Sequence, residues 1–152
     1  MAELKERLRA DLNAAMRARD KVRMRTLRMA LSSITNEEVA GASARQLSDD
    51  EVMKVLTREA RKRREAAEAF GAAGRDEQAA AERAEGEVLA GYLPAQLSDD
   101  ELSALVAAAI AETGASGMPA MGQVMKTLTP WIAGRADGAR VAAEVRRRLA
   151  AS

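Results

Sequence analysis

Apolar residues recur every three or four positions along almost the whole chain, and this spacing constrains the fold more than any other feature. The first segment shows it clearly, since its apolar side chains stand at Leu4, Leu8, Leu12, Ala15 and Met16. A period near 3.6 gathers such residues on one face of an α-helix, whereas a half-buried strand needs alternation. Comparable stripes fill most of the remaining chain. The sequence therefore predicts an all-α protein of seven helices with no strand.

The later stripes predict which face each helix buries. The second helix is expected to begin near Asp20, and a fourth, alanine-rich helix to run to about Gly91. We expect Gly71 and Gly74 to bracket the stop of the third helix and the restart of the fourth, and Pro130 to end the sixth. The residues expected to share one helical face are Leu27, Leu31 and Ile34; Val52, Val55, Leu56, Glu59, Arg63, Ala66 and Phe70, a stripe with polar members; and Met121, Val124, Met125 and Leu128. Burial is predicted for Leu102, Leu105, Val106, Ala109 and Ile110 in the fifth helix and for Val141, Val145 and Leu149 in the seventh.

A boundary is predicted at the phrase YLP, residues 92–94. Proline disfavours helical geometry at the residue before it, so a helix should end at or before Leu93. We therefore expect an N-terminal helical domain of about four helices at residues 1–93. A small three-helix domain should follow at residues 94–152.

The phrase QLSDDE occurs twice, at residues 46–51 and 96–101. In both copies a Ser precedes a Glu by three residues, which is the pattern of a capping box at a helix N-terminus. A structural repeat and a metal site built from the DDE acids are the alternatives. The flanking residues do not continue the match, and neighbouring acids point in different directions around a helix. First-turn acids also favour the helix dipole, so we interpret both copies as caps.

Composition argues against a conventional active site. The 152 residues include no His and no Cys, which removes the commonest general base, the thiol nucleophiles and the thiolate zinc sites. No P-loop or dinucleotide-binding glycine motif occurs. Ser–Lys catalysis is not excluded by composition, although no local signature supports it. We expect no cofactor, no metal and no self-sufficient enzyme. With no membrane span, no secretory signal and no Cys, a cytoplasmic location is expected.

Charge is distributed unevenly despite a net value of +1. Residues 1–36 carry nine Lys/Arg against four Asp/Glu. Cations gather on helical faces and at the C-terminus, and the candidate nucleic-acid contacts there are Lys21, Arg25, Arg28, Arg58, Arg61, Lys62, Arg147 and Arg148. Such stripes can follow phosphates. Alternatively, Glu65 and Glu68 neutralise several of them, and the terminal arginines only favour their helix dipole.

The stretch GQVMKTLTPWIAGRADGARV, residues 122–141, concentrates residues that shape a turn. Gly122 is expected inside the sixth helix, where a missing side chain would admit a neighbouring helix or a ligand backbone. Gly134 is expected as a left-handed cap. Asp137 should cap the last helix, with Gly138 as its first residue.

Three cations stand near this corner, namely Lys126, Arg135 and Arg140. A helix N-terminus with nearby cations can bind phosphate, although the Asp137 carboxylate competes for the same amides. The spacing alone leaves a phosphate site and a purely structural turn as alternatives.

Several stretches resemble the GatB/YqeY family, and specifically its stand-alone YqeY-like proteins, over nearly the whole chain. They are LRMALSSITNEEV at 27–39, KRREAAEAFGAAGR at 62–75, YLPAQLSDDEL at 92–102, MGQVMK at 121–126 and GRADGARV at 134–141. The last two resemble the tail domain of the B subunit of the glutamine-dependent aspartyl/glutamyl-tRNA amidotransferase.

The resemblance implies an all-helical fold and an association with tRNA, in which Lys126, Arg135 and Arg140 would contact RNA. In the amidotransferase the catalytic work belongs to other parts, so the label carbon–nitrogen ligase with glutamine as amido donor would be inherited from them. We therefore favour a non-catalytic helical module that binds tRNA or a tRNA-handling complex. Two alternatives stay open: an amidotransferase component, and an adaptor that docks a protein partner on its Met-rich sixth helix.

Overall fold

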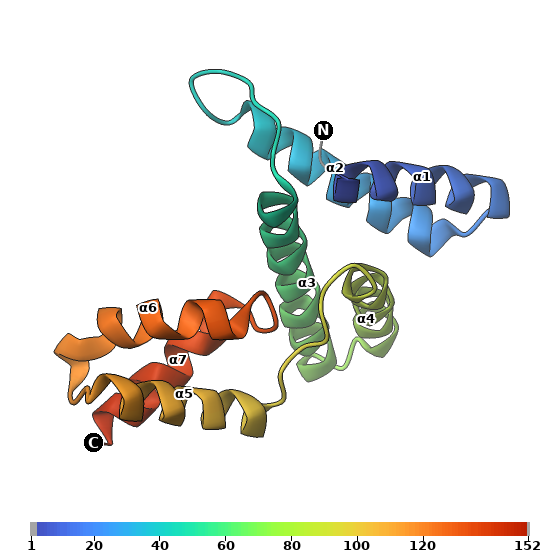
Figure 1. Ribbon diagram of the computed structural model, residues 1–152. Coiled ribbons are helices and arrows are strands. Elements are labelled where there is room, and N and C mark those ends of the chain that lie inside the picture. The colour runs from blue at the N-terminus through green and yellow to red at the C-terminus, as the bar shows by residue number, and fades with distance from the viewer. Residues whose placement is uncertain (1–2, 152) are drawn as a thin grey trace. The chain divides into compact units, whose positions relative to one another are not determined.

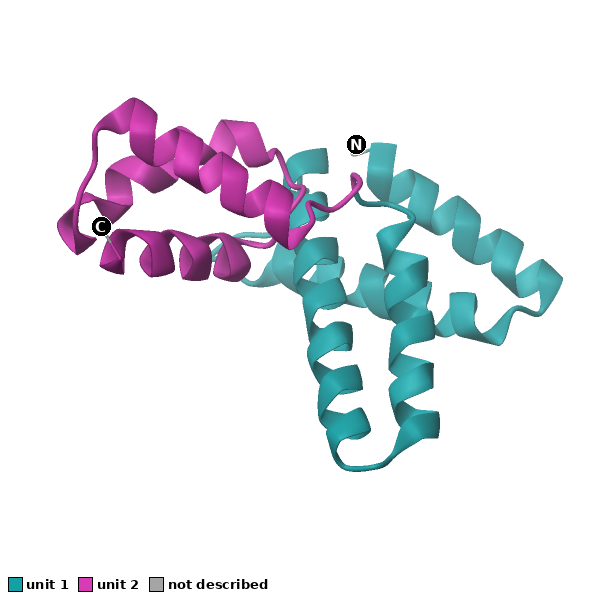
Figure 2. Ribbon diagram, turned by 90° about the horizontal axis from the view of Figure 1, so that it is seen from below, with its two compact units in different colours: residues 1–93 teal, residues 94–152 magenta. Residues whose placement is uncertain are grey.

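The computed structural model describes residues 3–151 and confirms the all-α class (Figure 1). Within that range it holds seven α-helices, one short 3₁₀-helix and no strand. The elements are α1 (Glu3–Ala18), α2 (Lys21–Val39), α3 (Asp49–Ala72), α4 (Asp76–Ala90), α5 (Asp99–Thr113), η1 (Met118–Ala120), α6 (Met121–Ile132) and α7 (Gly138–Ala150). They form two compact units, residues 1–93 and residues 94–152 (Figure 2). None of the described helices is long and apolar enough to span a bilayer.

The first unit is built from two helical hairpins. α1 packs against α2, and α3 runs alongside α4. Fully burying one Leu, Ile or Val side chain contributes about 1.5–3 kcal/mol, so the joined apolar stripes supply the main driving force for this packing. The buried residues are Leu4, Leu8, Leu27, Ala30, Ile34, Leu47, Val52, Val55, Leu56, Leu89 and Tyr92.

α3 carries charged side chains into the interior, as its predicted stripe indicated. Glu59 is only 5% exposed and accepts a hydrogen bond from the Ser33 hydroxyl of α2 at 3.1 Å. The Arg63 guanidinium lies 3.6 Å from the Glu59 carboxylate and 3.0 Å from that of Glu85 in α4. Buried charges are stable only when they are paired. This cluster therefore links α2, α3 and α4.

Tyr92 fastens the end of the first unit to α1. Its hydroxyl donates a hydrogen bond to the Asp11 carboxylate, and the Arg7 guanidinium lies 4.8 Å from the centre of its ring. Burial, followed by the hydrogen bond to Asp11, raises the pKa of Tyr92 to about 12. The phenol thus remains a donor throughout the neutral range.

The second unit packs α5, α6 and α7 around its own aliphatic core. Trp131 and the two methionines of α6, Met121 and Met125, are partly buried against this core. The Met residues therefore serve as core filling. The buried residues are Leu97, Leu102, Val106, Ala109, Val124, Leu128, Ile132, Ala136, Val141, Val145 and Leu149.

Both capping boxes are confirmed. The Ser48 hydroxyl accepts from the Glu51 amide at 3.3 Å, and the Glu51 carboxylate accepts from the Ser48 amide at 2.8 Å. The second copy repeats the pair between Ser98 and Glu101 at 3.1 and 3.0 Å. Each box satisfies amides that the first helical turn leaves without partners.

Two expectations about helix ends and burial were wrong. Pro130 does not end α6, which continues to Ile132. Pro130 removes only the one backbone hydrogen bond that its own amide would donate, and the continued turn buries Ile132 and lets the Ala133 amide donate to the Thr129 carbonyl at 3.2 Å.

The other concerns Met16. Met16 is 39% exposed, because Ala15, at 3%, takes the buried position in the last turn of α1. The stop and restart bracketed by Gly71 and Gly74, in contrast, is confirmed, because α3 ends at Ala72 and α4 begins at Asp76.

The first capping box should make the protein sensitive to acid. The ion pair with Arg45, and then the Ser48 amide, lower the pKa of Glu51 from 4.5 to about 2. A lowered folded-state pKa means that this stabilisation is complete above about pH 4.5 and is lost as the pH falls towards 2. We expect the melting temperature, followed by circular dichroism, to fall less over this range in Glu51→Gln. The exposed Glu68→Gln in the same helix is the control, and an equal acid loss in both variants would contradict the prediction.

Candidate nucleic-acid interface

The corner between α6 and α7 is shaped by left-handed residues and a side-chain cap. Ala133, the C-cap of α6, has φ 47°, and Gly134 after it has φ 79°. The left-handed conformation predicted for Gly134 is confirmed, although Ala133 is the cap residue itself. Asp137 caps α7 as predicted, since its carboxylate accepts from the Arg140 amide at 3.0 Å. Gly138 is the first residue of α7, also as predicted.

The segment that leads into α5 runs against this corner. The Leu97 amide donates to the Arg135 carbonyl at 2.7 Å, and the Gln96 side-chain amide donates to the Gly134 carbonyl at 3.4 Å. The Arg135 guanidinium in turn donates to the Ala95 carbonyl at 3.3 Å. The GRADGARV stretch thereby holds the second QLSDDE stretch in place.

Arg140 makes the strongest of these contacts. One of its terminal nitrogens donates to the Leu97 carbonyl at 2.7 Å, and the other donates to the Asp99 carboxylate at 2.7 Å. Arg135 adds an ion pair with Glu101 at 3.8 Å. Two of the three cations predicted at this corner are therefore committed to contacts within their own unit. No local sequence pattern indicated this pairing, because the partners lie about forty residues apart.

Lys126, the third cation at this corner, differs from Arg135 and Arg140. It is exposed, and no ion pair links it to an acid within residues 3–151. Gly122 lies in the first turn of α6, and a side chain added there would meet nothing within 4 Å. The interpretation that Gly122 admits a neighbouring helix is therefore wrong, because this turn faces open space.

The two acidic triplets have structural partners. Asp49 accepts from the Leu4 amide at 3.0 Å, and Asp99 accepts from Arg140. Within residues 3–151 the acids form no group of three that could hold a metal ion.

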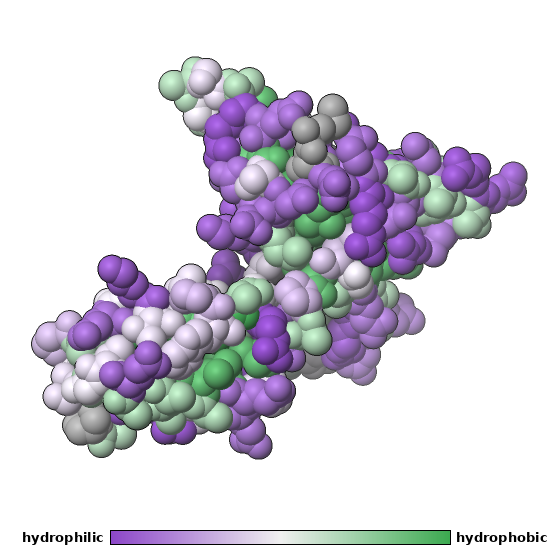
Figure 3. All heavy atoms as spheres, in the orientation of Figure 1, coloured by the Kyte–Doolittle hydropathy of each residue, from purple (hydrophilic) through white to green (hydrophobic). Residues whose placement is uncertain are grey.

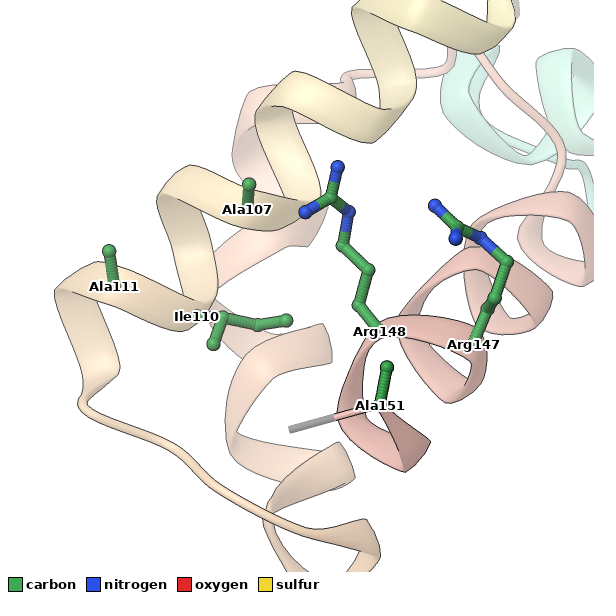
Figure 4. A pocket seen from close by; sticks show the side chains of 6 residues that line it. All are labelled: Ala107, Ile110, Ala111, Arg147, Arg148 and Ala151. Carbon is green, nitrogen blue, oxygen red and sulfur yellow. The ribbon is translucent and has the colours of Figure 1, made fainter.

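Arg147 and Arg148 line a shallow groove between α5 and α7, of about 450 Å³ (Figure 4). Its floor is aliphatic and consists of Ala107, Ile110, Ala111 and Ala151. Arg147 forms two hydrogen bonds with Glu144, at 2.9 and 2.7 Å, and Arg148 bonds to Ser103 and Glu144. The hydrogen bond from Arg147 is the main reason that the pKa of Glu144 falls to about 2. One carboxylate thus partly neutralises both cations.

The cations predicted on α3 are also paired with acids. Arg58 lies 3.5 Å from Glu37, Arg61 lies 3.9 Å from Glu65, and Lys62 lies 3.4 Å from Glu59. Only Glu65 had been expected in this role, because the other two acids come from α2 and from the buried side of α3.

The cations predicted on α2, unlike those on α3, are paired with acids only in part. Arg25 pairs with Glu85 of α4 at 2.7 Å. Lys21 and Arg28 are exposed and form no ion pair within the described residues 3–151, and Arg28 donates a hydrogen bond to the Met16 sulfur at 3.5 Å. Two of the three cations on this face of α2 are therefore not neutralised by neighbouring acids.

The turn from α1 to α2 adds cations that a search along single helices missed. From Arg17 to Arg28 the chain has six Lys/Arg and one acid, Asp20. Only residues 19 and 20 separate the two helices, so Arg17, Arg19 and Arg23 join the α2 stripe at this end of the hairpin. The hairpin tip is strongly hydrophilic (Figure 3, right). Counting cations across a predicted helix boundary would have found this cluster.

Arg19 has an unusual backbone for its residue type, with φ 57°. The Asp20 amide donates to the Ala15 carbonyl at 3.0 Å and the Arg19 amide to the Met16 carbonyl at 3.2 Å, as in a helix end that usually contains glycine. A left-handed residue other than glycine costs roughly 1–2 kcal/mol. The turn thus retains a cation where glycine would fit with less strain.

Comparison with known proteins gives a single family. A family model described as Yqey-like protein matches residues 5–149, as the sequence resemblance predicted. A search of the curated proteins finds no match.

Loss of the Arg140 contacts should destabilise the second unit. Hydrogen bonds to a charged group contribute about 1.5–3 kcal/mol, so Arg140→Ala should lower the free energy of unfolding by about that amount. The only tryptophan, Trp131, lies in this unit, so its fluorescence during urea unfolding reports on the second unit directly. Lys126→Ala is the control and should unfold like the unmodified protein. Arg140→Lys should recover little, because an ammonium cannot replace the fork of two donors. Equal midpoints for Arg140→Ala and Lys126→Ala would contradict this role.

Proposed function

The chain belongs to the Yqey-like family, whose model covers residues 5–149, and we propose that it is a non-catalytic helical module that binds tRNA. The observation that carries the proposal is the uncompensated positive charge on the exposed face of α2, at Lys21 and Arg28. Nucleic acids are recognised first through their phosphates, and cations already neutralised by nearby acids contribute little to that attraction.

Support for tRNA in particular comes from the C-terminal unit. The stretches at 121–126 and 134–141 resemble the tail of the amidotransferase B subunit, which is associated with tRNA. In our proposal Arg135 and Arg140 contribute by holding the corner in shape, because their guanidiniums are bound to residues 95–101. Lys126 is the cation of this corner that remains to contact a phosphate.

The adaptor alternative has less support than it had on sequence alone. Its proposed docking surface was the methionine stripe of α6, and Met121 and Met125 pack against the core of their own unit. We therefore keep tRNA binding as the function that the exposed charges favour.

The proposal predicts binding that weakens steeply with salt. Titration of labelled tRNA, followed by fluorescence anisotropy at increasing KCl, should show log K falling by about 0.7–0.9 per neutralised phosphate for each unit of log salt. Lys21→Gln with Arg28→Gln should weaken binding and reduce this slope, since two phosphate contacts are lost.

Arg75→Gln with Arg83→Gln is the matched control, because it removes the same charge from two exposed positions, the N-cap and the middle of the acidic helix α4. Lys126→Glu tests the C-terminal corner without disturbing the bonds of Arg135. The proposal fails if tRNA shows no salt-sensitive binding at low ionic strength.

A further inference from the structure

We infer that the tip of the α1–α2 hairpin is the main phosphate-binding site of this protein, and that it takes the backbone of a double-stranded RNA stem. The inference rests on the proposed function and specifies where and how that function is performed. The tip is defined by Arg17, Arg19, Lys21, Arg23 and Arg28.

The first support is the balance of charge at the tip. Within residues 3–151, none of its five cations forms an ion pair. The one acid of the turn, Asp20, already accepts a hydrogen bond from the Arg23 amide at 3.1 Å as the N-cap of α2. Arg25, which shares this helix, is held by Glu85 and is therefore left out of the site.

The second support is the conformation of Arg19. Its left-handed backbone is one that glycine adopts freely and that an arginine adopts at a cost in free energy. Strained residues persist where the surrounding structure holds them, and they are common at functional sites. The Arg19 side chain is exposed, so burial in the core does not account for an arginine at this strained position. Contact with an anion gives a physical reason for an arginine here.

The choice of a duplex follows from the residues that the tip lacks. Proteins that hold unpaired bases commonly stack them on aromatic side chains. The first aromatic residue of this chain is Phe70, so the whole α1–α2 hairpin has none. Paired RNA is instead recognised through its shape, its phosphates and its 2′-hydroxyls. Cations on both sides of the turn between α1 and α2 fit this recognition of phosphates, in which the base sequence of the RNA is not read.

Two RNA probes and one pair of variants test the inference with the full-length chain. The probes are a perfectly paired RNA duplex and an oligouridine of the same length, compared by fluorescence anisotropy in one buffer. We expect tighter binding to the duplex. Arg17→Gln with Lys21→Gln should reduce duplex affinity by on the order of tenfold or more at about 0.1 M salt and lower the salt slope by roughly 1.4–1.8, as expected for two lost contacts. Arg75→Gln with Arg83→Gln should leave duplex affinity close to that of the unmodified protein.

Arg19→Gly separates binding from folding. Glycine relieves the left-handed strain, so the melting temperature should be unchanged or higher. The duplex affinity should nevertheless fall about fivefold, because one phosphate contact is lost. A variant that is equally stable and binds equally well would show that Arg19 takes no part in the site.

The outcomes distinguish this inference from the proposed function. Equal losses in the hairpin variant and the α4 control would overturn the hairpin site while leaving tRNA binding intact. Equal or tighter binding of oligouridine would overturn the duplex preference. No salt-sensitive binding of tRNA, duplex or oligouridine would overturn the proposed function and this inference together.

Discussion

Each unit is stabilised by narrow aliphatic stripes on its helices. These stripes are buried only when the helices pack against one another in one particular register. The cores contain Leu, Val, Ile and Ala with little aromatic surface, so each contact contributes modestly and many arrangements of similar area are available. Polar contacts between helices reduce the number of these arrangements. In the first unit the Glu59–Arg63–Glu85 cluster ties α3 to its neighbours, and in the second unit Arg140 holds the segment that enters α5. Buried or partly buried polar groups favour the arrangement that satisfies them, because leaving one unpaired is costly.

The same requirement separates structural cations from cations available to a ligand. Arg58, Arg61, Lys62, Arg135, Arg140, Arg147 and Arg148 all lie next to acids of the same unit. Their positive charge is compensated within the fold. The hairpin tip and Lys126 lack such partners within residues 3–151, and they are the places where a phosphate would meet a net positive field. The GRADGARV stretch, which resembles part of a tRNA-associated tail, thus shapes the second unit. Among the described residues, the larger group of unpaired cations lies at the tip of the α1–α2 hairpin in the first unit.

Much of the fold could be predicted, and the site only in part. Helix periods, the two capping boxes and the Asp137 cap depend on residues within a few positions of each other, so local chemistry determines them. Pro130 was misjudged because the burial of Ile132, a tertiary effect, favours one more turn of α6. Arg140 was assigned to RNA because its partners Leu97 and Asp99 lie far away in sequence, and no local pattern indicates that distance.

By itself the sequence determined the all-helical class, the starts of the capped helices and most of the buried faces. These follow from periodicity and from hydrogen bonds that close within one turn. Only the tertiary structure decided which cations are neutralised, because an ion pair depends on the approach of side chains from different helices. It also decided that Arg19 stands at a strained turn between two basic helix ends. Charge along the chain could be counted beforehand, but its compensation in space is a property of the packed helices.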